Sequence, residues 1–100
     1  MGVTTVAERL REIRTKIETA ADAVRADQGA SPVLTAVVGE FAAKAEKAAG
    51  AGDERAAVIE LEQAGDSAKV AAEADTGVTD ATREAVLDAH LAICITKSKL

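Results

Sequence analysis

The chain has 100 residues with one Phe and no Trp or Tyr, and its 17 acidic and 12 basic side chains give a formal net charge of −5. This length fits one domain, and the lack of aromatic and β-branched runs in period two excludes a β-sandwich or barrel. The acidic balance argues against nucleic-acid binding, which needs a basic face. Abundant Ala, Glu, Lys, Arg and Leu at helical spacing instead predict an all-α domain.

Localisation signals are sparse. One cysteine cannot form an internal disulfide, so an oxidising compartment is not required. The apolar runs are far shorter than the roughly 20 residues that span a bilayer, and no basic segment followed by an apolar one opens the chain as in a signal peptide. We therefore expect a cytoplasmic protein without a membrane segment. The C-terminal Ser98-Lys99-Leu100 has the form of a peroxisomal import signal, which would apply only in a eukaryotic cell.

The first predicted helix covers about residues 5–28. Thr5 and Glu8 fit a capping box at its start, and we expect Gly29 to end it in the usual C′ role. Its apolar residues follow at alternating steps of four and three, which is typical of a narrow helix–helix seam. They are Val6, Leu10, Ile13, Ile17, Ala20 or Ala21, and Val24.

The second predicted helix covers about residues 32–49, with Ser31 as its N-cap and Pro32 at its first position. The turn Gly50-Ala51-Gly52 follows, and so short a link places the second and third helices antiparallel. The apolar face of the second helix consists of Leu34, Val37, Val38, Phe41, Ala42, Ala45 and Ala48.

The third predicted helix covers about residues 53–75, and Asp53 can cap it. Gly39 and Gly65 would lie at similar heights on this hairpin, where they would let the two helix backbones approach closely. The alternative is a break at Gly65-Asp66-Ser67 that would divide this helix in two. Its predicted buried face consists of Ala57, Val58, Leu61, Ala64, Gly65, Ala68 and Ala72.

The fourth predicted helix covers about residues 79–96, and Thr79 is its expected N-cap. Four amphipathic segments with short connections favour an antiparallel up-down-up-down four-helix bundle. The fourth segment holds the densest apolar run of the chain, and on a helix this run spreads over roughly 200°, whereas one core needs a stripe of about 100°. The residues of this arc are Val86, Leu87, His90, Leu91, Ile93, Cys94 and Ile95.

The single His and the single Cys stand four residues apart on this helix. The spacing of His90 and Cys94 can present two ligands to one metal ion, but zinc needs a third protein ligand. We expect the apolar faces of the other three helices to supply no carboxylate there. We therefore interpret His90 as a hydrogen-bonded core or interface residue and Cys94 as a small buried hydrophobe, and we expect neither a metal nor a cofactor.

Catalytic patterns are not evident. Histidine phosphotransfer domains are helical bundles that expose the His and follow it with Lys and Gly, whereas Leu91 and Ala92 follow His90. A phosphotransfer site at His90 therefore stays a weak alternative, as a metal site does. The chain offers no Ser/His/Asp arrangement and no Gly-rich phosphate loop between a strand and a helix. We expect that the protein is not an enzyme.

The sequence contains more apolar residues than its predicted core needs, and this excess favours association with another protein chain as the function. Ile59 and Val70 add apolar surface on the side of the third helix away from its predicted core, and Leu91 and Ile95 widen the arc of the fourth. Such exposed patches usually mark a partner surface. We expect a non-enzymatic interaction module that self-associates through the fourth helix, as a homodimer with two-fold symmetry. The alternative is a small acidic adaptor, chaperone or immunity-type protein that binds a larger, basic partner.

Overall fold

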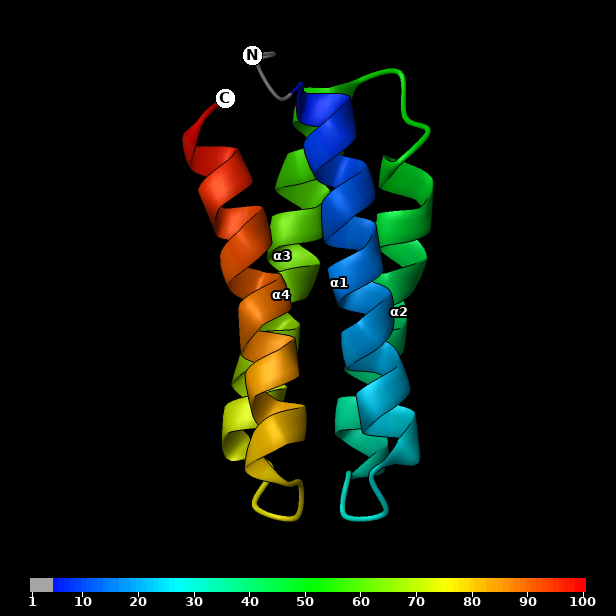
Figure 1. Cartoon of the computed structure of the whole chain (residues 1–100), viewed down its shortest axis with the longest axis vertical. Coiled ribbons are helices and arrows are strands. Elements are labelled where there is room, and N and C mark those ends of the chain that lie inside the picture. The colour runs from blue at the N-terminus through cyan, green and yellow to red at the C-terminus, as the bar shows by residue number, and fades with distance from the viewer. Residues whose placement is uncertain (1–4) are drawn as a thin grey trace.

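The structure, a computed structural model, describes residues 5–100. Residues 1–4 lie outside the described range, and so does the part of the signal-peptide prediction that concerns them. Its helices are α1 (Val6–Ala26), α2 (Pro32–Ala48), α3 (Glu54–Ala74) and α4 (Asp80–Ser98). Neighbours along the chain pack together, α1 also packs against α4, and the helices run alternately up and down (Figure 1). The prediction of an antiparallel four-helix bundle is confirmed.

Each helix begins where a side-chain oxygen can accept a hydrogen bond from the first helical turn. Thr5, Ser31, Asp53 and Thr79 each accept one from the backbone N–H three residues further on, at 3.0–3.2 Å. These bonds satisfy donors that have no partner inside the helix. The four predicted N-caps are thereby confirmed, and they fix where each helix enters the bundle.

The core is built from one aromatic ring, a few branched residues and many alanines, which lets the helices pack closely. The predicted buried face of α3 is buried at every position. The largest fully buried side chains are Leu10, Ile17, Leu34, Phe41, Leu61 and Ile93.

Within residues 5–100, no helix is both long enough and apolar enough to cross a membrane.

The two glycines predicted to bring helix backbones together behave differently. A Cβ added at Gly65 would lie 3.1 Å from the ring of Phe41 on α2 and 3.3 Å from the ring of His90 on α4, whereas a Cβ at Gly39 would meet nothing within 4 Å. The predicted close approach through Gly39 is therefore wrong, and Gly65 makes room for two side chains instead. The alternative of a break near Gly65 is also wrong, because α3 is continuous.

The loops α1–α2 and α3–α4 lie side by side at the end of the bundle away from the termini (Figure 1). Asp27 Oδ2 accepts a hydrogen bond from the backbone N–H of Thr79 at 2.9 Å, and Asp75 Oδ2 accepts one from the N–H of Ser31 at 2.8 Å. Each aspartate thus binds the N-cap residue that begins the helix after the other loop. This exchange ties the two helical hairpins together.

Two glycines allow this contact between the loops. A Cβ on Gly29 would overlap the carbonyl oxygen of Gly77, and a Cβ on Gly77 would overlap that of Gly29. The expectation that Gly29 ends α1 in the left-handed C′ role is wrong, because none of the glycines within residues 5–100 has a positive φ and α1 ends in the extended cap residue Asp27. Glycine is needed here for space between two backbones, since its conformational freedom is not used.

Candidate functional site

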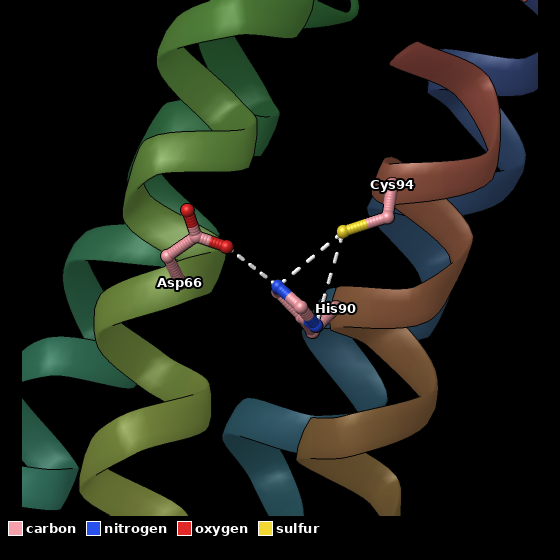
Figure 2. Close-up of side chains that lie close together, drawn as sticks. All are labelled: Asp66, His90 and Cys94. Carbon is pink, nitrogen blue, oxygen red and sulfur yellow. Dashed lines mark hydrogen bonds and ion pairs between the residues drawn. The ribbon is translucent and has the colours of Figure 1, made fainter. Parts of the chain in front are cut away.

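Three side chains with metal-binding donor atoms meet on the seam between α3 and α4 (Figure 2). Asp66 comes from α3, and His90 and Cys94 come from successive turns of α4. One donor atom from each side chain lies within 4.8 Å of the other two. Over residues 5–100 this is the one such group of three, and we refer to it as the Asp66–His90–Cys94 cluster.

The register of the α3–α4 hairpin brings the cluster together. Asp66 stands as many residues before Val78, in the connecting loop, as His90 stands after it, so the antiparallel helices place the two opposite each other. The adjacent Gly65 has no side chain to keep the imidazole away, and a Cβ there would lie only 3.3 Å from the His90 ring. Gly65 therefore lets the ring lie against α3 and reach the carboxylate.

Both neighbours of the imidazole are closest to the same ring nitrogen. His90 Nε2 lies 2.7 Å from Asp66 Oδ1, and Cys94 Sγ lies 3.4 Å from Nε2 but 3.9 Å from Nδ1. The His90 side chain is only 15% exposed, whereas that of Asp66 is 58% exposed. The cluster is therefore enclosed at the imidazole and open to solvent at the carboxylate.

Two carboxylates and two lysines, Glu62, Asp66, Lys69 and Lys97, carry the charges around the Cys94 thiol. The hydrogen bond from His90 is the main reason that the pKa of Asp66 lies below its usual value. Burial raises the pKa of the Cys94 thiol, and the nearby carboxylates of Glu62 and Asp66 raise it further. Glu62 is itself bound by Lys97, with 3.1 Å between Oε2 and Nζ. At neutral pH the cluster thus combines a charged carboxylate with a protonated thiol.

This geometry differs from that of a nucleophilic triad. In a triad the carboxylate binds one imidazole nitrogen and leaves the other to take the proton of the nucleophile. Here Asp66 Oδ1 and Cys94 Sγ converge on the single atom Nε2. Because Nε2 is already engaged by the carboxylate, it is equally unsuited to accept a phosphoryl group. The cluster is arranged so that three donor atoms can share one centre.

The predicted association residues separate into two sets. Leu91 and Ile95 on α4, 57% and 44% exposed, help to line a groove of about 440 Å³ between α1 and α4. Ile59 and Val70, 37% and 64% exposed, lie on α3 and do not line this groove. Leu91 and Ile95 thus share one groove, whereas Ile59 and Val70 are exposed on another helix.

Sequence reasoning missed Asp66. The expectation that the other helices supply no carboxylate near His90 is wrong, because α3 places the Asp66 carboxylate 2.7 Å from its imidazole. Counting outward from Val78, in the α3–α4 loop, pairs Asp66 with His90 and Glu62 with Cys94. That count, with the neighbouring Gly65 as a sign of close packing, is the signal that could have found it.

The fold and the cluster together define an antiparallel four-helix bundle with a mixed carboxylate, imidazole and thiol site on the seam of one hairpin. No protein-family model, curated protein or solved structure matches this chain.

Proposed function

We propose that the protein is a non-enzymatic interaction module that forms a homodimer through α4. The observation that carries the proposal is the pair of exposed apolar residues, Leu91 and Ile95, beside the groove between α1 and α4. Two large aliphatic side chains in water are unfavourable, because each Å² of apolar surface removed from water contributes about 25 cal/mol. A partner that covers this groove would remove both side chains from water.

The charges along the groove favour a second copy of the chain as the partner. Arg9, Lys16, Glu12 and Asp88 line it, so cations and acids are balanced in number. A two-fold axis exchanges equivalent residues between the copies, so the cations of one can face the acids of the other. A larger, basic partner would be better served by a groove with acids alone, which is why this alternative is the weaker one.

The size of the chain sets the extent of the contact. A standard interface buries about 800 Å² per partner, roughly one seventh of the 5684 Å² surface of the described residues. Leu91 and Ile95 would therefore form the centre of the contact, and neighbouring parts of α1 and α4 would form its polar rim.

The test is the solution mass by light scattering over a hundredfold range of concentration. For a chain of 10.2 kDa, the expected result is a dimer mass for the wild-type protein and a monomer mass for Ile95→Glu and Leu91→Glu. Each substitution would bury a charge at the centre of the interface, which is strongly unfavourable. Val70→Glu is the matched control, because it places the same charge on an exposed apolar position of α3.

Circular dichroism of each variant should show unchanged helicity, since all three positions are exposed. A wild-type monomer at every concentration would overturn the proposal, and salt-sensitive capture of a basic protein would then favour the adaptor alternative. A dimer that Val70→Glu dissociates and Ile95→Glu leaves intact would also overturn it, because the interface would then lie on α3.

A further inference from the structure

We propose that Asp66, His90 and Cys94 form a binding site for a zinc-class divalent transition-metal ion. The cluster lies on the seam of α3 with α4, whereas the proposed dimer surface lies on the side of α4 toward α1. The two proposals therefore rest on different residues, and each can fail without the other.

The ligand set fits zinc in kind. Imidazole nitrogen, thiolate sulfur and carboxylate oxygen are the three donors that Zn²⁺ uses in proteins. Mg²⁺ and Ca²⁺ prefer oxygen donors alone, so a site with a sulfur and a nitrogen selects against them. One thiolate and one carboxylate also balance the two positive charges of the ion, which suits a partly buried place. Co²⁺, with similar preferences, can serve as a visible substitute.

Two of the three distances between donor atoms are close to those of a tetrahedral site, and the third, between Cys94 Sγ and the Asp66 carboxylate, is at most 4.8 Å and has to shorten by up to about 1 Å. Metal–ligand bonds of about 2.0–2.3 Å place the donor atoms of a tetrahedral zinc site roughly 3.2–3.8 Å apart. The 3.4 Å between Cys94 Sγ and His90 Nε2 lies within this range, and the 2.7 Å between Nε2 and Asp66 Oδ1 has to widen by about half an ångström. Asp66 is exposed, so its side chain can turn by that amount without disturbing the core.

The surroundings hold the imidazole and leave one side open. Gly65 lies against both the His90 ring and the fully buried Phe41, so the inner side of the site is apolar and closely packed. The outer side opens to solvent beside Asp66, where water can complete the coordination as in sites with three protein ligands. Metal binding at Nε2 uses the neutral imidazole with its proton on Nδ1, so a proton on Nε2 passes to Nδ1, or to solvent where Nδ1 already carries one, and the thiol proton of Cys94 passes to solvent.

The experiment is a titration of the metal-free, reduced full chain with Co²⁺, followed by its absorption. A thiolate–cobalt charge-transfer band and intense ligand-field bands should appear and saturate at one ion per chain, and zinc should abolish them. Cys94→Ser should remove the thiolate band, and Asp66→Asn should weaken cobalt binding about tenfold or more. Glu73→Gln is the matched control, because it makes the same carboxylate-to-amide change on α3 at a residue that pairs with Lys69.

A second readout needs no variant in the cluster. Zinc should slow alkylation of Cys94 in the wild-type chain about tenfold or more, because a coordinated thiolate is protected from the reagent. Ile95→Glu should bind cobalt like the wild-type protein even if it is monomeric, which separates this site from the proposed dimer. Absence of a thiolate band at saturating cobalt, an unchanged alkylation rate with zinc, or equal loss of binding in Glu73→Gln would each overturn the proposal.

Discussion

Aspartates in two regions of this bundle have different neighbours. In the paired end loops, Asp27 and Asp75 receive backbone N–H groups, each from a glycine two residues on and from the N-cap residue of the other hairpin. On the α3–α4 seam, Asp66 instead meets the imidazole of His90, with the thiol of Cys94 beside it. In the first region the carboxylates connect the backbones of the two loops. In the second region the carboxylate of Asp66 meets side chains whose protons a metal ion can replace.

The difference separates a structural site from one that can take a ligand. Backbone N–H donors cannot give up their protons or turn away, so a carboxylate that they surround is a fixed part of the fold. Imidazole and thiol can each exchange a proton for a metal ion, and the site is open to solvent beside Asp66. A carboxylate alone therefore does not indicate function. The hydrogen-bond donors around it indicate whether its role is structural or ligand-binding.

The largest effect should come from closing the space between the loops. Gly29→Ala or Gly77→Ala would place a Cβ on the carbonyl oxygen of the opposite glycine, and both sides of this contact are backbone. We expect a loss of about 2–3 kcal/mol in the free energy of unfolding, as for an overpacked core. Denaturant unfolding measures this loss, with cobalt binding unchanged if the two regions are independent.

Gly39→Ala is the matched control for the loop variants. Gly39 lies within α2, and a Cβ there meets nothing within 4 Å. Alanine is a better helix former than glycine, so this variant should gain up to about 1 kcal/mol. Equal effects at Gly29 and Gly39 would show that the loops do not pack as closely as described.

Local signals explain why the sequence predicted the helices well. The caps Thr5, Ser31, Asp53 and Thr79 depend on the residue and the turn that follows it, and the buried faces repeat at the helical period. These signals need no knowledge of neighbouring helices. Association through the four exposed apolar residues, Ile59, Val70, Leu91 and Ile95, stays a prediction.

Contacts across helices were harder to predict, because a single residue does not carry them. In the sequence alone, Asp66 is an ordinary polar residue of a helix. Its contact with His90 arises only when the antiparallel hairpin places the two residues opposite each other. The loop segments Asp27-Gln28-Gly29-Ala30-Ser31 and Asp75-Thr76-Gly77-Val78-Thr79 share the pattern Asp-x-Gly-x-Ser/Thr. Read alone, each suggests only a helix end and a cap. Their reciprocal bonds emerge when the bundle brings the two loops together.

Gly65→Ala should have an intermediate effect and act on the seam alone. Its Cβ would lie 3.1 Å from the ring of Phe41, which is fully buried, and 3.3 Å from the ring of His90, so that both rings would be crowded. Crowding costs more than alanine gains in helix propensity, so we expect a net loss of about 1 kcal/mol. Displacement of His90 should also weaken cobalt binding, which the loop variants should leave unchanged. Unaltered cobalt affinity would contradict the role given to Gly65 in placing the imidazole.

The smallest effect concerns the acid sensitivity of the end loops. The backbone N–H of Thr79 for Asp27, and that of Ser31 for Asp75, are the main causes that lower the pKa of each carboxyl below its usual 3.8. The folded state therefore binds fewer protons than the unfolded state, so this stabilisation is present above about pH 4 and is lost as the pH falls through the lowered pKa values.

The double variant Asp27→Asn with Asp75→Asn tests this dependence by urea unfolding at neutral pH and at pH values below 4. An amide keeps one acceptor oxygen and cannot titrate, so the variant should be less stable than the wild type at neutral pH and lose less of its stability in acid. The control Asp22→Asn changes an exposed carboxylate that pairs with Arg25 on the surface of α1. If the double variant and the control lose equal stability in acid, the loop carboxylates do not cause the acid sensitivity.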